Sequence, residues 1–209
     1  MRENSCVIRL LCTVIILFIS AGVSFSQEFT GLTAFATIIK PTNSLDEGFG
    51  GGASADFRVL KKIFIRPCYE FITFEPNAGT FLCTTYRRHS VSLSFMYQYK
   101  LGYAWFPFID AGLGYYFHKL LAKKSIGWGT AVTKECDKEK LKNGFGYHIA
   151  PGIKVQISPR LVMNFIGKML FYNTKKTRFV DIYGNYGSKS VTDLSLSHFQ
   201  VSWGITLLF

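Results

Sequence analysis

The sequence predicts an all-β chain that forms an eight-stranded, antiparallel, up-and-down transmembrane β-barrel. Three observations predict it: apolar and polar residues alternate with period two, connections are alternately short and long, and the polar face is rich in Gly and Ser. The composition agrees, since 48% of the 209 residues are hydrophobic, 16% are aromatic and only 18% are charged. These values exclude an intrinsically disordered chain. Beyond the N-terminus no apolar run is long enough for a bundle of transmembrane helices.

The first 26 residues have the three parts of an export signal. Arg2 and Arg9 supply a positive start, an apolar stretch follows, and Ser24-Phe25-Ser26 is a small-x-small cleavage site. The alternative is a membrane anchor, but the apolar stretch is too short to span a bilayer comfortably. We therefore expect a signal peptide at 1–26 and a barrel domain at 27–209. Cleavage removes two Arg and one Glu, so the net charge falls by one from +11.

Eight segments in order along the chain can be assigned as strands. The clearest is 144–157, where odd-numbered residues from Phe145 to Ile157 are mostly apolar or aromatic and even-numbered ones are small or polar. The segments 28–40 and 160–173 alternate poorly, and the second could form a helix, but we assign both as strands from context. Most of the segments are long enough to cross a bilayer when tilted. The predicted strands are 28–40, 48–60, 62–74, 88–100, 104–118, 144–157, 160–173 and 194–209.

The connections between these strands alternate in length. Residues 60–62, 100–103 and 158–160 are short turns, whereas three connections are long: 75–87, 119–143 and 174–193. Short turns at one end and long loops at the other are typical of up-and-down membrane barrels. Because the number of strands is even, both termini lie at the short-turn end. We expect that end to face the periplasm and the long loops to be extracellular.

The composition of the polar face indicates which side of the sheet points inward. The rival is a soluble secreted barrel of the lipocalin type, with apolar residues inside. A solvent-facing strand would avoid Gly, yet Gly and Ser dominate the polar face and suit the narrow interior of an eight-stranded barrel. We therefore expect the apolar face to meet lipid, and Cys68 to point inward. The charged residues expected in the lumen are Asp56, Arg58, Arg66, Glu70, Asp110, Lys154 and Lys168.

Aromatic residues gather near both ends of the predicted strands. One group, at the periplasmic end, contains Tyr97, Tyr99, Tyr103, Trp105 and Phe106; the other contains Tyr115, Phe117, Phe171 and Tyr172. Two such bands are typical of the interfacial girdles of a membrane barrel. Ordinary core aromatics are the alternative.

These features together resemble the small eight-stranded outer-membrane β-barrel proteins, a group that includes the OmpA transmembrane domain, OmpX and porin-like barrels of the Bacteroidetes. The resemblance covers the mature chain and rests also on the segment 108–115 and the last strand. That strand, with Trp203 and the terminal Phe209, resembles the family's signal for the outer-membrane insertion machinery. The resemblance implies a bacterial outer membrane and this machinery as a partner. It does not imply one activity, because the fold hosts many.

Catalytic and metal sites are not expected. The mature histidines are His89, His118, His148 and His198, and none begins the His-x-Ser motif of outer-membrane deacylases. The cysteines lack metal-ligand spacing, so we expect no cofactor. Cys83 and Cys136 fall in long loops, and either a disulfide between them or free or differently paired thiols would fit.

Clustered cations in the long loops could contact the phosphates of lipopolysaccharide. A solvated basic loop is the alternative, and nucleic acid is not an expected partner of an exported barrel. The residues are Arg87, Arg88, Lys119, Lys123, Lys124, Lys175, Lys176 and Arg178.

The leading hypothesis for function is a non-enzymatic, monomeric, surface-exposed structural or interaction barrel of the porin-like family. An eight-stranded barrel is narrow enough for side chains to fill, so a largely closed lumen is expected. The alternatives are an accessory barrel of a secretion or transport assembly, and an enzyme that modifies lipid.

Overall fold

The computed structural model describes residues 28–40, 45–76, 85–126, 130–135, 139–182 and 185–209. Within these ranges the chain is all-β, and no helix there is long and apolar enough to cross a membrane. The predicted signal peptide at 1–26, as well as Cys83 and Cys136, lies outside the described residues.

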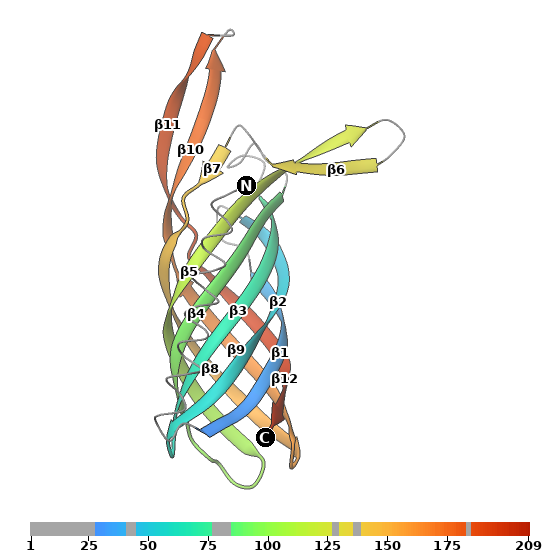
Figure 1. Cartoon of the computed structure of the whole chain (residues 1–209), viewed down its shortest axis with the longest axis vertical. Helices are drawn as coiled ribbons and strands as arrows, with labels where there is room; N and C mark the ends of the chain where they lie inside the picture. The colour runs from blue at the N-terminus through green and yellow to red at the C-terminus, as the bar shows by residue number, and fades with distance from the viewer. Residues whose placement is uncertain (1–27, 41–44, 77–84, 127–129, 136–138, 183–184) are drawn as a thin grey trace.

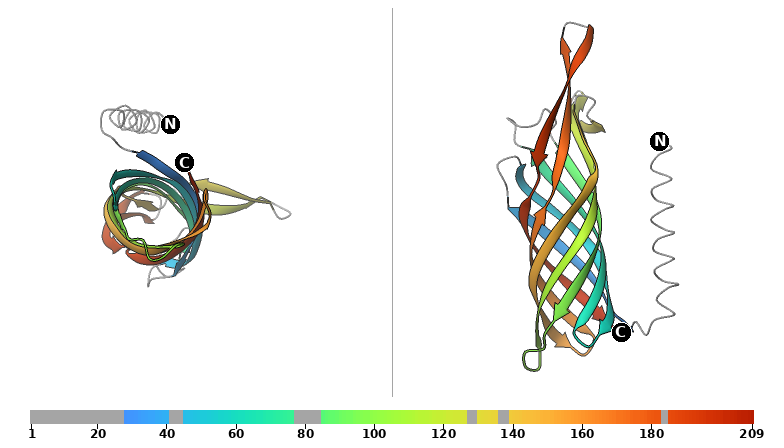
Figure 2. Two further views of the ribbon diagram at one scale, coloured as in Figure 1. Left: turned by 90° about the horizontal axis from the view of Figure 1, so that it is seen from below. Right: turned by 90° about the vertical axis from the view of Figure 1, so that its left-hand side faces the viewer.

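Eight of the strands form a closed antiparallel barrel, which confirms the predicted fold class (Figure 1). They are β1 (Glu28–Lys40), β2 (Leu45–Leu60), β3 (Ile63–Pro76), β4 (Thr85–Gln98), β5 (Trp105–Ile126), β8 (Gly144–Ser158), β9 (Leu161–Phe171) and β12 (His198–Leu208). Around the wall they follow the order β4-β3-β2-β1-β12-β9-β8-β5, and pairing of β4 with β5 closes the ring. Figure 2 shows this ring in the view along the barrel.

The segment that could have been a helix is the strand β9. Its Met163 and Phe165 are exposed on the outer wall, whereas Asn164 between them is 1% exposed and points inward. β9 pairs with β8 on one side and with β12 on the other. The assignment from context is therefore confirmed, although β12 begins at His198 rather than at the predicted residue 194.

Two of the three long connections, 119–143 and 174–193, contain further strands where the sequence predicted loops. The outer part of β5 pairs with β6 (Thr130–Glu135), and β10 (Asn173–Ile182) pairs with β11 (Asn185–Ser195) and with β7 (Glu139–Leu141). The β5–β6 hairpin projects sideways, and the β10–β11 hairpin rises beyond the barrel (Figure 1). Continued antiparallel pairing satisfies backbone amides and carbonyls that an irregular loop would leave to water.

The short turns lie at the barrel end opposite these hairpins. Lys61 and Lys62 form the turn between β2 and β3. Between β4 and β5, Gly102 has a φ of 70°, a left-handed conformation that glycine adopts without steric cost. At this end the ring of Phe29 in β1 stacks on that of Phe209 after β12, with centroids 5.1 Å apart. Both ends of the barrel-forming chain therefore lie beside the short turns.

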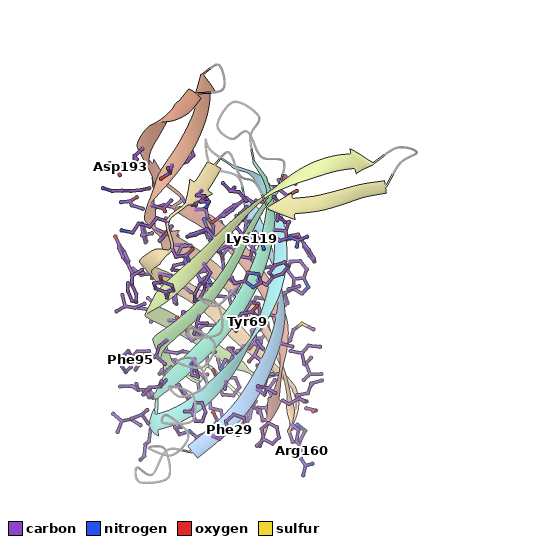
Figure 3. The ribbon with its side chains drawn as sticks, turned by 45° about the horizontal axis from the view of Figure 1, so that its top comes forward. Phe29, Tyr69, Phe95, Lys119, Arg160 and Asp193 are labelled. Atoms are coloured by element: carbon purple, nitrogen blue, oxygen red, sulfur yellow. The ribbon has the colours of Figure 1, made fainter. Side chains whose placement is uncertain are left out.

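Apolar side chains cover the outside of the barrel, and polar side chains fill its interior. Phe95 and Leu113 are 61% and 67% exposed, whereas Glu70 and Gln200 are 2% and 0% exposed. Figure 3 shows Phe95 at the outer edge of the wall. This arrangement is the reverse of a lipocalin-type interior, so the soluble rival is wrong.

Two apolar clusters occupy the two ends of the interior. The outer cluster, toward the hairpins, contains Ile39, Ile72, Phe74, Tyr86, Tyr116, Leu120, Leu170, Tyr172 and Leu196. The inner cluster, toward the short turns, contains Phe64, Met96 and Phe108, with the half-buried Ile166 packed against them. Placing Tyr172 in the outer aromatic girdle was wrong: it is 3% exposed and lies inside the barrel.

Glycines in the wall make room for large interior rings. A Cβ on Gly52 would lie 2.6 Å from Phe35 Cζ and 2.2 Å from the Tyr69 carbonyl oxygen. A Cβ on Gly204 would lie 2.6 Å from Phe35 Cβ. Phe35 therefore packs against Gly52 and Gly204. Neither position tolerates a side chain, because Phe35 and the neighbouring backbone already fill the space.

Candidate functional site

The first group of buried charges centres on Arg66, beside the inner cluster. Arg66 Nε donates to Asp56 Oδ1 over 2.7 Å, and its Nη1 lies 3.4 Å from Asp110 Oδ2. Lys154 Nζ donates to Asp56 Oδ2 over 2.6 Å. His148 Nε2 lies 3.0 Å from Asp110 Oδ1. These five residues, from β2, β3, β5 and β8, form what we call the inner network.

A second group, the outer network, centres on Glu70. Its Oε2 accepts a hydrogen bond from Arg88 Nη2 at 3.1 Å, and its Oε1 accepts from Lys168 Nζ at 3.0 Å and from Gln200 Nε2 at 2.7 Å. His198 Nδ1 donates to the carbonyl two residues before it, over 2.7 Å. That bond assigns the proton to Nδ1, so Nε2 can accept from Arg88 Nη1 at 3.0 Å.

The guanidinium groups connect the networks to the apolar clusters. The Arg88 Cζ lies 5.6 Å from the ring centroid of Phe74 and 5.4 Å from that of Tyr116, in the outer cluster. The Arg66 Cζ lies 5.1 Å from the Phe108 centroid, in the inner cluster. Desolvated cation–π contacts of this kind are attractive, so each cluster and its adjacent network pack as one unit.

Burial makes these charges depend on one another. An isolated buried charge is costly, and an ion pair offsets that cost only when its geometry is good. Within the two networks, three carboxylates (Asp56, Glu70, Asp110) face four cations (Arg66, Arg88, Lys154, Lys168). Removal of Asp56 would therefore leave Lys154 without its carboxylate partner, and removal of Glu70 would leave both Arg88 and Lys168 without theirs.

A small cavity lies between the two networks. Its volume is about 40 Å³, and its lining includes Cys68, Ser92, Ser202 and parts of both networks. Such a polar cavity has room for a few water molecules. It is bounded by residues of the inner and outer networks.

Six of the seven charged residues predicted for the lumen belong to these networks, but Arg58 does not. Arg58 lies near the end of β2 and is exposed, with its Cζ 5.9 Å from the Phe64 ring centroid. Arg58 lies two residues after Asp56, so alternation places both side chains on the same face of the strand, and Asp56 is buried. The prediction for Arg58 is wrong because the strand reaches the mouth of the barrel before this residue.

Two residues predicted to contact lipopolysaccharide phosphates are buried instead. Arg88 is 2% exposed within the outer network, and Lys176 is 8% exposed in β10. Those two predictions are wrong. The signal for Arg88 was in the sequence, because it alternates in phase with Ser90 and Ser94, which are also buried.

The other predicted phosphate contacts have different positions. Lys119 and Lys175 are exposed, and Arg87 is half-buried on the outer wall. The side chains of Lys123, Lys124 and Arg178 lie outside what the structure describes. Trp203 in the middle of β12 and Phe209 after its end, the residues of the predicted insertion signal, are 41% and 76% exposed on the outer wall.

The histidines do not assemble a hydrolytic site within the described residues. Ser94 Oγ donates to Asp110 Oδ2 over 2.9 Å, and His148 Nε2 lies 3.0 Å from the other oxygen of Asp110. In a catalytic triad the histidine stands between the serine and the acid, whereas here the acid stands between the other two. The described residues also include no group of three His, Cys, Asp or Glu side chains that could hold a metal ion.

Known proteins resemble this chain in structure but not in sequence. No family model and no curated protein matches the sequence. Among solved structures, the outer membrane protein OprG from Pseudomonas aeruginosa matches with a TM-score of 0.65 at 11% identity, covering 88% of this chain and 98% of that one. Neisserial surface protein A matches with a TM-score of 0.53 at 13% identity, covering 88% and 99%. A major outer membrane protein from Thermus thermophilus matches with a TM-score of 0.53 at 14% identity, covering 87% and 100%.

The chain thus has the fold of the small eight-stranded outer-membrane β-barrels. At these identities the likeness concerns the fold alone, and the fold carries many functions. The function of this barrel therefore depends on its own lumen and outer wall.

Proposed function

We propose that the protein is a non-enzymatic, integral outer-membrane barrel with a closed lumen, whose outer hairpins form a surface for structural or interaction roles. Support for membrane residence comes from the outward-facing apolar residues and from aromatic side chains near both ends of the wall. Tyr97 and Trp105 are 47% and 50% exposed toward the short-turn end, and Tyr147 and Phe145 are 53% and 77% exposed toward the hairpins. A soluble protein rarely exposes so continuous an apolar surface.

The filling of the barrel interior by buried side chains is the observation that supports the proposal. The outer cluster, outer network, inner network and inner cluster are stacked along the interior, and the cavity between the networks is about 40 Å³. A permanent pore would require a continuous column of water. Opening one would expose paired charges and apolar rings together, and that costs more than moving a single side chain.

The direction of insertion follows from the positions of turns and hairpins. Short turns and periplasmic termini are the general arrangement of bacterial outer-membrane barrels. With that orientation the β5–β6 and β10–β11 hairpins extend into the extracellular space, where they would meet other molecules. The arrangement of Ser94, Asp110 and His148 argues against acyl-transfer chemistry in the lumen, because the histidine cannot activate the serine from its position.

Two pairs of assays, one for folding in the bilayer and one for permeability, test the proposal together. A heat-shift gel and flotation with vesicles establish that the protein is folded in the bilayer. Dye-loaded vesicles carrying the floated protein should then retain the dye, and planar bilayers should show no steady nanosiemens-scale steps. A steady conductance of that size in folded protein would overturn the closed lumen, and recovery in a soluble fraction without heat shift would overturn membrane residence.

A further inference from the structure

Two cations face each other on the outer wall, near the end that carries the hairpins. Arg87 in β4 and Lys119 in β5 are direct cross-strand partners. Both alternate in phase with outward-facing residues of their strands, Phe95 and Leu113. Directly opposed side chains in an antiparallel pair lie about 5 Å apart at Cβ. Two positive charges are therefore held close together on the outside of the barrel.

An aromatic band lies immediately on the short-turn side of this pair. His89 faces Phe117 in β5 and Phe71 in β3, and the His89 and Phe71 ring centroids are 4.7 Å apart. Below these, the Tyr69 hydroxyl lies 2.7 Å from His89 Nδ1. Figure 3 shows Lys119 nearer to the hairpins than Tyr69. Because aromatic side chains collect where hydrocarbon meets headgroups, the two cations lie at the level of the headgroups.

Like charges placed opposite each other in a sheet are destabilising. The Nε of Arg87 is buried and has no hydrogen-bond partner among the described residues. Lys119 is exposed beside it. An anion between the two side chains would offset their repulsion, and the forked guanidinium with the adjacent ammonium is suited to the several oxygens of a phosphate.

We propose that Arg87 and Lys119 form a binding site for the phosphate group of an outer-leaflet lipid. The lipid chains would lie along the apolar wall below Phe117, and the phosphate would sit between the two cations. The inference rests on the proposed placement in an outer membrane. It selects one pair of residues at a defined depth, whereas Arg88, the neighbour of Arg87, points into the lumen and takes no part.

The test uses the full folded barrel in dodecyl maltoside micelles, whose headgroup carries no phosphate, with binding followed by native mass spectrometry. The probe is diphosphoryl lipid A, compared with the same lipid after removal of its phosphates and with inorganic phosphate. R87Q/K119Q should lower the affinity for diphosphoryl lipid A about tenfold or more, because two charge-assisted contacts are lost. R87K should lie between, since it keeps the charge but loses the fork.

The matched control is R160Q, which removes one exposed cation at the opposite end of the barrel (Figure 3). Its affinity should stay within about twofold of the unmodified protein. If R87Q/K119Q fails the heat-shift criterion for folding, K119Q alone decides, with an expected loss of about threefold.

Three results would overturn the site: unchanged binding in the folded variants, equal binding of dephosphorylated lipid A, or inorganic phosphate binding as tightly as the lipid. These outcomes are separable from failure of the proposed function. If the barrel conducts but lipid binding is intact, only the proposal of a closed lumen is overturned. If the barrel does not conduct but its variants bind lipid A with unchanged affinity, only the proposed phosphate site is overturned.

Discussion

Arg88 Nη2 lies 3.1 Å from Glu70 Oε2, and both side chains are 2% exposed within the barrel. The preceding residue, Arg87, belongs to the outward-facing set and stands opposite Lys119. Two adjacent arginines therefore have opposite environments because successive side chains of a strand point to opposite faces. Arg88 forms an ion pair inside the barrel, and Arg87 contributes to the surface that we propose for lipid phosphate.

The Glu70 carboxylate should be essential for stability. In Glu70→Gln, Arg88 and Lys168 stay buried but lose their carboxylate partner. Breaking a buried ion pair in this way lowers the free energy of unfolding by about 3–5 kcal/mol. Urea unfolding of the protein in lipid vesicles measures the free energy. Asp193→Asn, on the exposed face of β11, is the control and should change stability by less than about 0.5 kcal/mol. Equal stability of both variants would show that the outer network contributes little.

Exposed apolar residues should differ in their tolerance of charge according to whether lipid surrounds them. Leu113 on β5 is 67% exposed, and Val191 on β11 is 53% exposed. In vesicles, Leu113→Arg should cost about 2–4 kcal/mol, because a charge on the lipid face near mid-membrane is unfavourable. Val191→Arg, on the hairpin beyond the barrel, should cost less than about 0.5 kcal/mol. In a protein surrounded by water both substitutions would be equally harmless, and that result would contradict the membrane assignment.

The glycine at position 52 should not accept even a methyl group. A Cβ there would lie 2.2 Å from the Tyr69 carbonyl oxygen, so Gly52→Ala forces the backbone apart and should cost about 1–3 kcal/mol. At Gly144 the nearest atom to a Cβ, the Tyr172 hydroxyl oxygen, would be 3.4 Å away. Gly144→Ala should therefore leave the urea midpoint almost unchanged. A smaller loss for Gly52→Ala than for Gly144→Ala would refute the packing argument.

Phe209, which follows β12, should matter more for assembly in cells than for refolding in detergent. Phe209 is 76% exposed, and its ring stacks on Phe29. If it is read by the insertion machinery, Phe209→Ala should lower the heat-shifted fraction in membranes, while refolding of the purified variant stays close to normal. Phe199→Ala, at the other end of β12 and 42% exposed, controls for loss of an outward aromatic residue. Equal assembly of both variants would count against the insertion signal.

The sequence by itself determined which segments cross the membrane region and which side chains point inward. Period-two alternation identified six of the eight strands and context the other two, all close to their observed positions, and Gly and Ser on the polar face indicated a narrow polar interior. These features are local, because each depends on residues a few positions apart on one strand. Alternation also indicates that Arg88 points inward, but the position of Arg88 beside a long connection suggested a role on the outer surface.

The tertiary structure decided which buried charges meet and where the chain extends beyond the barrel. Asp56 receives a hydrogen bond from Lys154, 98 residues away, and Glu70 receives one from Lys168, also 98 residues away. Such partners depend on the tilt and stagger of strands around the closed ring, which no single strand encodes. The same closure placed Arg58 at the mouth rather than inside. Alternation within a strand selects a face, but only the assembled barrel selects the neighbour across the lumen.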